Sequence, residues 1–219
     1  MKVKRLLDLI VAITALLLLA PLMVALTIIV RIDSPGPALF RQRRVGRLGV
    51  PFTVLKFRSM YNGSSQSLHH QASLDWFNER RQSNRYKSES DPRVTRLGKY
   101  LRRTSMDELP QLLNVVKGDM SLVGPRPLIE YERTRCEGID FEREKVRPGL
   151  TGLWQVSGRD RLSARQMLAL DVRYVREWSL WLDIKILART IPTVLGDLRH
   201  TSSPAESTAT VTPTNSIET

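Results

Sequence analysis

The sequence predicts an α+β protein that is mainly helical and inserts into a membrane through its N-terminus. An uncharged apolar run extends from Leu9 to Val30, two alternating stretches follow between Ala38 and Met60, and helical segments dominate from there to about residue 198. We therefore expect a membrane-inserted helix at 1–33, a membrane-associated domain at 34–200 and a disordered tail at 201–219.

The apolar run has the length of a membrane segment but carries a proline at its midpoint. A helix of about 20 apolar residues crosses a bilayer, so Leu9–Val30 is long enough to span. Pro21 removes one helical hydrogen bond, and basic residues flank both ends of the run, which favours the cytoplasmic side for both. The residues alone leave open a kinked crossing and a re-entrant helix that breaks at Ala20-Pro21 and returns.

The next elements are a turn and a small β-hairpin. Ser34–Pro37 ends the membrane helix, and Ala38–Gly46 and Pro51–Met60 alternate on either side of a turn centred on Gly49. We expect the basic residues of this hairpin to share one face. Residues 61–90 lack sustained periodicity and predict a loop with a short helix near 74–81.

The rest of the chain predicts helices joined by rigid turns. The expected helices are 97–101, 111–117 (closed by Gly118), 128–145 (interrupted at Gly138), 163–183, and 184–198 (with a break at Pro192). Residues 124–127 are expected to be extended, and 147–156 to be a glycine-rich loop that runs into a short strand. Trp178 and Trp181 lie beside basic residues, which suits either an amphipathic helix at the lipid headgroups or an ordinary core.

Composition narrows the class of partner. The formal net charge is +12, and the last 19 residues contain no lysine or arginine, so the basic charge belongs to residues 1–200. Such a charge suits nucleic acid, anionic lipid or a phosphorylated substrate. Cys136 is the single cysteine, which rules out an intrachain disulfide, and no Cys/His cluster has zinc spacing. No Walker or dinucleotide-binding glycine motif is present either.

Asp107 and Glu108 are the candidate catalytic pair. A carboxylate can attack phosphorus, and the basic surroundings favour its ionised form. Ser105 and Glu108 also have the spacing of a helix capping box, so the two acids could serve only to begin a helix. Both interpretations place Asp107 at a helix N-terminus, where backbone N–H groups favour a bound phosphate.

Cationic residues supply the complementary half of a phosphate site. The candidates for substrate binding are Lys56, Arg58, Arg93, Arg126 and Arg147. Prolines beside Arg126 and Arg147 restrict the backbone, which suits bidentate phosphate binding by arginine. A diphosphate substrate would need Mg²⁺ with a carboxylate as its protein ligand.

Several stretches carry a resemblance to a known family. They are Ser34–Pro37 with Phe40 and Gln42, Lys56–Met60, Asp91–Gly98, Leu101–Leu112, Lys117–Ser121, Val123–Pro127 and Arg147–Gln155. Together they resemble the bacterial sugar transferases, monotopic phosphoglycosyl transferases that begin glycan assembly on polyprenol phosphate. The resemblance covers about residues 1–198, and the chain resembles the minimal catalytic form of the family.

The resemblance implies a mechanism, a cofactor and partners. Asp107 matches the nucleophile that takes a sugar phosphate from a UDP-sugar and releases UMP, after which undecaprenyl phosphate receives it. Mg²⁺ would contact Asp107 with Glu108 in support, and the membrane element would be re-entrant, broken at Ala20-Pro21. The implied location is the cytoplasmic face of the bacterial inner membrane. The implied partners include membrane lipids and downstream glycosyltransferases, with a homodimer as one option and no nucleic acid.

Two other classes compete with an enzyme. A membrane-tethered protein that binds anionic lipid or nucleic acid has the same net charge, although no nucleic-acid motif appears. A scaffold for glycan assembly with an inactive acidic pair is the other. The sequence leaves open the sugar and the pathway, whether exopolysaccharide, capsule, O-antigen or protein glycan.

Overall fold

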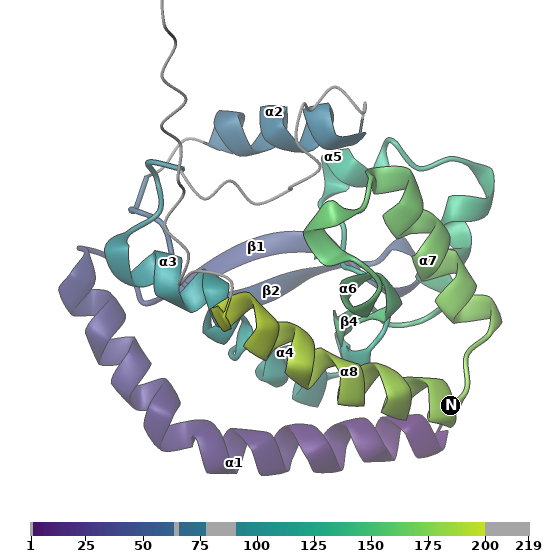
Figure 1. The fold of residues 1–219 in the computed structure, drawn as a ribbon, viewed down its shortest axis with the longest axis horizontal. Coiled ribbons are helices and arrows are strands. Elements are labelled where there is room, and N and C mark those ends of the chain that lie inside the picture. Colours follow the sequence, from purple (N-terminus) through teal and green to yellow (C-terminus); the bar gives the residue numbers. More distant parts are fainter. Residues whose placement is uncertain (1, 64–65, 78–90, 200–219) are drawn as a thin grey trace, which may run out of the picture.

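The computed structural model describes residues 2–63, 66–77 and 91–199, and these residues confirm a mainly helical α+β fold (Figure 1). The predicted disordered tail at 201–219, and residues 64–65 and 78–90 of the predicted loop, lie outside the described residues.

The elements follow one another in this order: α1 (Lys2–Asp33), β1 (Leu39–Val45), η1 (Arg47–Gly49), β2 (Pro51–Phe57), α2 (Gln66–Phe77), α3 (Arg96–Arg103), η2 (Met106–Glu108), α4 (Gln111–Lys117), β3 (Ser121–Val123), α5 (Glu130–Arg133), η3 (Gly138–Lys145), β4 (Gly149–Thr151), α6 (Leu153–Val156), η4 (Arg159–Arg161), α7 (Ala164–Arg176) and α8 (Leu180–Arg199). Here η denotes a 3₁₀ turn.

Helix α1 is long, apolar and largely outside the protein core. Its composition and length suffice to cross a membrane, and only 11% of its most apolar window is buried. Leu17 and Leu18 are 72% and 76% exposed, which a core helix of a soluble protein would not show. Figure 1 shows α1 bending along its length, and Pro21 accounts for a bend because it lacks the N–H for one helical bond. The helix bends at its proline-containing centre rather than ending there.

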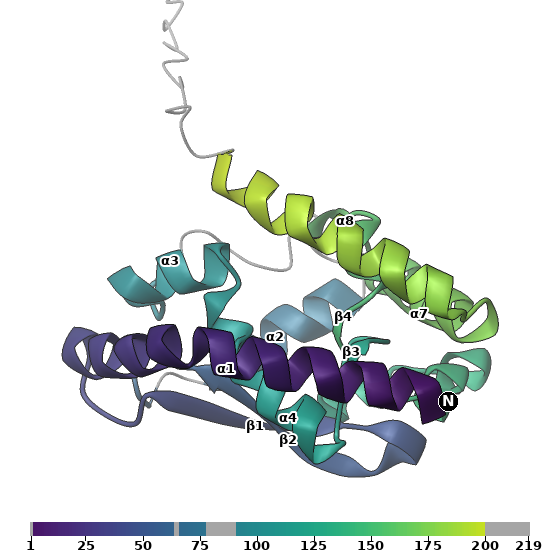
Figure 2. The same cartoon turned by 90° about the horizontal axis from the view of Figure 1, so that it is seen from below.

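The first turns of α1 are bound to the body of the protein. Arg5 donates to the carbonyls of Val115 (2.6 Å) and Val116 (3.0 Å) at the end of α4. The buried Asp8 accepts hydrogen bonds from the Ser121 hydroxyl (2.8 Å) and the Leu122 N–H (3.2 Å) of β3. Figure 2 shows α1 lying across one face, with α4 and the hairpin against it. The N-terminal end of α1 is therefore fixed beside the core.

The C-terminal end of α1 is bound to the same body. Arg58, which follows β2, is buried and donates to the carbonyls of Val30 (3.0 Å), Ser34 and Pro35 (2.8 Å). A guanidinium there satisfies carbonyls that have no helical partner and favours the negative end of the helix dipole. Both ends of α1 are thus held by polar contacts to one body, and the exposed apolar residues lie between them.

The predicted β-hairpin is confirmed. Strands β1 and β2 pair antiparallel from Leu39↔Phe57 to Val45↔Pro51, and Met60 makes a separate bridge to Val94. The expectation that its basic residues share one face is wrong. Because alternate residues face opposite sides, Arg41 and Arg43 lie on one face, and Arg44 shares the other with Lys56.

A buried side chain of helix α4 makes hydrogen bonds to the free edge of β2. Asn114 accepts from the Leu55 N–H (3.1 Å) and donates to the Thr53 carbonyl (2.7 Å), so its amide replaces the backbone of a neighbouring strand. Gly118 ends the helix at φ +95°, as the sequence predicts. This contact fixes the position of α4, and of the turn before it, relative to Lys56.

We expect Asn114→Ala to lower the free energy of unfolding by about 2 kcal/mol, because two partly buried backbone groups of β2 lose their partner. Thermal unfolding in lipid nanodiscs measures this change. The matched control is Asn62→Ala at an exposed asparagine, for which we expect less than about 0.5 kcal/mol. Equal effects of the two substitutions would show that Asn114 does not fasten α4.

A short parallel sheet, which the sequence analysis missed, joins two loops that are distant in the chain. Ser121 pairs with Gly149, and Val123 with Thr151. Gly124 and Gly149 pack so closely that a Cβ at either position would collide with backbone. This pairing brings the Pro125–Pro127 segment beside Arg147 and Pro148.

Several helix boundaries differ from the expected ones. The short helix expected at 74–81 is α2, which begins earlier, at Gln66. The helix expected at 128–145 is only the short α5 and the 3₁₀ segment η3, separated near Gly138 (φ +47°). The short strand expected within 147–156 is β4 (Gly149–Thr151), and residues 153–156, after the strand pairing ends at Thr151, form α6.

The boundary expected between residues 183 and 184 is also wrong. Helix α7 ends at Arg176 and α8 begins at Leu180, where the Ser179 hydroxyl accepts the Leu182 N–H (3.1 Å) and so acts as a cap. Pro192 does not end α8.

Candidate active site

The acidic pair lies on the 3₁₀ turn η2, between α3 and α4. Asp107 is only 5% exposed, and the turn continues directly into α4 through Leu109 and Pro110, both in helical conformation. Proline is compatible with this position because the first N–H groups of a helix have no helical partner. The pair therefore sits one turn before α4, close to the predicted helix N-terminus.

The capping box predicted from Ser105 and Glu108 does not form. Ser105 adopts a left-handed conformation (φ +56°) and makes no side-chain cap, and its hydroxyl instead accepts a hydrogen bond from Arg159 (2.9 Å). Glu108 pairs with Lys56 of β2 at 2.7 Å. Contacts from distant parts of the chain thus replace the local cap. A non-glycine residue in this region is uncommon and occurs often at functional sites.

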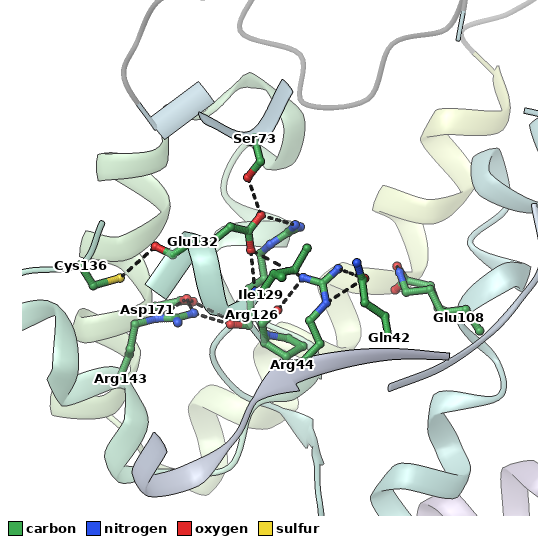
Figure 3. A network of polar contacts seen from close by, with 12 residues as sticks. Gln42, Arg44, Ser73, Glu108, Arg126, Ile129, Glu132, Cys136, Arg143 and Asp171 are labelled. Carbon is green, nitrogen blue, oxygen red and sulfur yellow. Dashed lines mark hydrogen bonds and ion pairs between the residues drawn. The ribbon is translucent and has the colours of Figure 1, made fainter. Parts of the chain in front are cut away.

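The hairpin face that carries Lys56 also carries Gln42 and Arg44. Arg44 donates from Nε (3.0 Å) and Nη2 (2.6 Å) to Oε1 of Gln42. Figure 3 shows the Gln42 side chain lying next to Glu108, at one end of a polar network that continues through Arg44. The hairpin face that carries Lys56 therefore connects the acidic pair with the buried polar network around Arg44.

Glu132 holds the middle of this network and is fully buried. Its carboxylate accepts the Ser73 hydroxyl (2.9 Å) and the Ile129 N–H (2.9 Å), and lies 3.6 Å from Arg44 and 3.8 Å from Arg126 (Figure 3). Burial alone would raise the pKa of Glu132, but Arg126, Arg44 and the two hydrogen bonds outweigh it, so its pKa is lowered. Glu132 is thus a buried anion that positions two arginines.

Arg126 is fixed from several sides. Its guanidinium lies over the rings of Trp154 (5.5 Å) and Trp76 (5.9 Å), and its backbone N–H donates to Asp171 (3.1 Å). Asp171 is fully buried and pairs with Arg143 (2.6 Å), which also donates to the Arg126 carbonyl. Burial raises the pKa of Asp171, with Arg143 opposing the shift. The prolines around Arg126 predicted a rigid arginine, and packing adds to that rigidity.

The structure engages the other three predicted cations elsewhere. Arg58 donates to carbonyls at the end of α1, and Arg147 to the Gly118 carbonyl at the end of α4 (2.7 Å). Arg93 donates hydrogen bonds from Nε (2.9 Å) and Nη2 (2.7 Å) to the carboxylate of Asp91. These bonds lower the pKa of Asp91, although its partial burial acts in the opposite direction. Of the five cations, Lys56 contacts the acidic pair, and Arg126 belongs to the network that ends beside it.

A cavity of about 290 Å³ adjoins the acidic pair. Ser105, Glu108, Gln155 and Arg159 supply polar groups to its lining, and Leu187 of α8 is among its apolar walls. The sequence analysis missed Arg159 and Gln155 as site residues. The run from Arg147 to Gln155 signalled part of this wall, but no local pattern indicated that Arg159 would reach Ser105.

The acidic pair offers the oxygen ligands that Mg²⁺ prefers. Among the described residues there is no group of three or more His, Cys, Asp or Glu arranged to hold a metal alone. Mg²⁺ bound with a nucleotide typically uses one or two carboxylates together with substrate phosphates. Two adjacent carboxylates, one of them neutralised by Lys56, fit that mode rather than a metal cage made entirely by the protein.

Comparisons with known proteins agree on one family. The chain is 46% identical to a "UDP-galactose-lipid carrier transferase" of Erwinia amylovora and 44% to an "Undecaprenyl-phosphate galactose phosphotransferase" of Salmonella typhimurium, each across 88% of this chain and 40% of the relative. It is 43% identical to a "UDP-glucose:undecaprenyl-phosphate glucose-1-phosphate transferase" of Caulobacter vibrioides, across 88% of this chain and 69% of the relative.

The chain thus spans about two fifths of the length of the first two relatives. The family model described as "Bacterial sugar transferase" matches residues 1–197, which include α1, the hairpin, the acidic pair and the cavity. The chain belongs to the bacterial sugar transferase family.

Proposed function

We propose that this protein transfers a sugar phosphate from a UDP-sugar to undecaprenyl phosphate, as the first membrane step of a glycan assembly. The observation that carries the proposal is the position of Asp107, nearly buried beside the Lys56–Glu108 ion pair, in a chain tied to an apolar helix. The names of the relatives support undecaprenyl phosphate as the acceptor. They also support a donor that carries galactose or glucose.

Asp107 is the nucleophile of the first step. A carboxylate oxygen attacks the phosphorus that bears the sugar, the bridging P–O bond breaks, and UMP leaves with the bridging oxygen. Lys56 pairs with Glu108, which reduces the electrostatic repulsion between the adjacent carboxylates. The product of this step is a phosphosugar bound covalently to Asp107.

The second step returns the enzyme to its starting state. A phosphate oxygen of undecaprenyl phosphate attacks the same phosphorus, the bond to Asp107 breaks, and the lipid diphosphosugar leaves. Arg159 would offset phosphate charge, because it reaches the turn that carries the acids, whereas the Arg126 guanidinium lies 3.8 Å from the buried Glu132. The two substrates need never be bound together.

Asp107 would hold Mg²⁺, with Glu108 in support. When bound, the metal would offset the charge of the diphosphate.

Membrane association follows from α1, and we propose that α1 is re-entrant. Arg5 and Asp8 hold its beginning and Arg58 holds its end, so both ends face the same body of the protein. The domain would then lie on the cytoplasmic face of the bacterial inner membrane, where UDP-sugars are available. The exposed Trp181 suits an interfacial position for α8.

A labelled-donor assay tests the reaction. Protein in lipid nanodiscs receives Mg²⁺, undecaprenyl phosphate and UDP-glucose or UDP-galactose labelled in the sugar. We expect label to move into the lipid extract with one UMP released per lipid product, and removal of the metal by EDTA to stop both. Release of UDP instead of UMP would indicate transfer of the sugar without its phosphate and would refute the proposal.

We expect Lys2→Cys and Arg41→Cys, each in a Cys136→Ser background, to react with a membrane-impermeant maleimide from the same side of the membrane. Both positions are exposed: Lys2 is the first residue of α1, and Arg41 lies on β1, the strand that follows α1. Labelling of inverted and right-side-out vesicles measures the side. Reaction of the two cysteines from opposite sides would mean that α1 crosses the bilayer.

A further inference from the structure

The cavity beside the acidic pair has one charged edge and apolar walls. Leu109, Leu122, Leu150, Val156 and Leu187 contribute apolar side chains, and Glu108 and Arg159 lie at the polar edge. Its volume of about 290 Å³ is near the lower end of the range for small-molecule sites, ~300–1,000 Å³. Such a cavity suits an elongated apolar group that carries an anionic head.

Arg159 gives this edge its charge and links it to the catalytic turn. It lies on η4 in a left-handed conformation (φ +51°) and donates from Nη2 to the Ser105 hydroxyl at 2.9 Å. Ser105 itself is left-handed and directly precedes Met106 and Asp107. The two unusual backbone conformations place a guanidinium where the turn of the nucleophile meets the cavity.

Helix α8 connects the cavity with the lipid-exposed side of the molecule. Leu187 and Thr190 line the cavity, whereas Trp181 and Ile191 of the same helix are 63% and 64% exposed. The helix starts beside α1, because Asp183 pairs with Lys4 at 2.6 Å. An apolar chain that leaves the cavity along α8 would therefore reach the bilayer.

We propose that this cavity binds the prenyl units next to the phosphate of the acceptor, with that phosphate at Arg159. The inference rests on the proposed function and adds the place at which the acceptor binds. A nucleotide or sugar suits these walls poorly. The Thr104, Thr151 and Thr190 hydroxyls of the lining already form hydrogen bonds within the protein, and the hydroxyl and amide groups of such a ligand would otherwise face leucines. The prenyl chain of the acceptor presents only hydrocarbon to these walls. Its phosphate then lies at the edge lined by Glu108, the neighbour of Asp107.

Leu187→Trp fills the cavity and tests this assignment through the two substrates separately. We expect the KM for undecaprenyl phosphate to rise roughly 10- to 100-fold, the range that changes of size in an apolar pocket produce, while the KM for the UDP-sugar changes less than about twofold. Leu48→Trp is the control, because Leu48 is 70% exposed on η1, and we expect both KM values to stay at wild-type level. A rise in the donor KM alone would assign the cavity to the UDP-sugar and overturn the proposal.

A labelling experiment makes the test independent of turnover and of the folding of one variant. A prenyl phosphate that carries a diazirine on its second isoprene unit is photolysed with the wild-type protein in nanodiscs, and the labelled peptides are identified. We expect label on α6 and α8, and we expect it to decrease in both Leu187→Trp and Arg159→Gln. Label confined to α1, or unchanged in both variants, would show that the chain binds elsewhere.

The two proposals fail in different ways. If the wild-type protein is labelled in the cavity but produces no lipid-linked sugar, the proposed reaction is wrong and the prenyl site stands. If lipid-linked sugar forms and Leu187→Trp leaves the acceptor KM unchanged, the reaction stands and the prenyl site is wrong.

Discussion

Asp107→Asn is expected to lower sugar-phosphate transfer by on the order of 10³-fold or more, because an amide cannot form the phosphosugar bond. Asparagine has nearly the same size as aspartate, so the site, in which residue 107 is 5% exposed, should keep its shape. UMP release with saturating donor and acceptor measures the effect. Unfolding curves that match the wild type would show that the loss is chemical.

Glu108→Gln is the matched comparison for this substitution. It removes the charge that Lys56 pairs with, but it leaves the nucleophile in place. We therefore expect a smaller loss than for Asp107→Asn, accompanied by a change in the Mg²⁺ concentration that gives half-maximal rate. If Glu108→Gln were the more damaging substitution, the roles given to the two acids would have to be exchanged.

Glu132→Leu is expected to lower the free energy of unfolding by about 3–5 kcal/mol, the range found when one partner of a buried ion pair is removed. Arg44 and Arg126 would remain in the protein interior without their carboxylate, and Ser73 would lose its acceptor. Thermal and denaturant unfolding in nanodiscs measure the loss. The matched control is Glu130→Gln on the same helix, where the side chain is exposed and little change is expected.

The pH dependence of stability distinguishes the charge of Glu132 from its packing. Its pKa in the folded protein lies below the ordinary value near 4.5, so its charge contributes stability above that pH. The contribution is lost as the pH falls through the lower, folded-state pKa. Glu132→Gln keeps the size of the side chain, so the variant should lose less stability on acidification than the wild type. An unchanged acid dependence would contradict an ionised Glu132.

Elements with a local signal could be predicted from the sequence. The apolar run predicted α1, and the alternation of apolar and polar residues predicted the β1–β2 hairpin. Gly118 ends α4 as expected. Adjacent acids in a basic chain indicated the candidate site, where Asp107 is nearly buried and Glu108 pairs with Lys56. These features depend on neighbours in the chain, which the sequence displays directly.

Features that depend on distant partners could not be predicted in the same way. The pattern from Ser105 to Glu108 favoured a capping box, but Arg159 and Lys56, each about 50 residues away, bind the two side chains instead. The parallel pairing of β3 with β4 likewise has no local signal. Arg58 and Arg147, both predicted to bind phosphate, instead donate hydrogen bonds to carbonyl groups at the ends of α1 and α4. The sequence does not distinguish these two uses of an arginine.

The contacts of α1 relate membrane insertion to the position of the catalytic pair. Arg5 binds the last carbonyls of α4, and the acidic pair lies one turn before the first residue of the same helix. Asn114 holds that helix to the hairpin that supplies Lys56. If α1 lies in the bilayer as we propose, its depth would set the depth of Asp107 relative to the lipid phosphates.

Intact-protein mass spectrometry tests the central claim most directly. The protein in nanodiscs is mixed with Mg²⁺ and a panel of UDP-sugars, without undecaprenyl phosphate, and its mass is compared with that of Asp107→Asn. Our account predicts a mass gain of one phosphosugar in the wild type with the cognate donor, no gain in the variant, and loss of the added mass when acceptor is supplied. Lipid-linked sugar formed by a wild-type protein that never gains this mass would contradict the covalent mechanism and indicate direct transfer between the substrates.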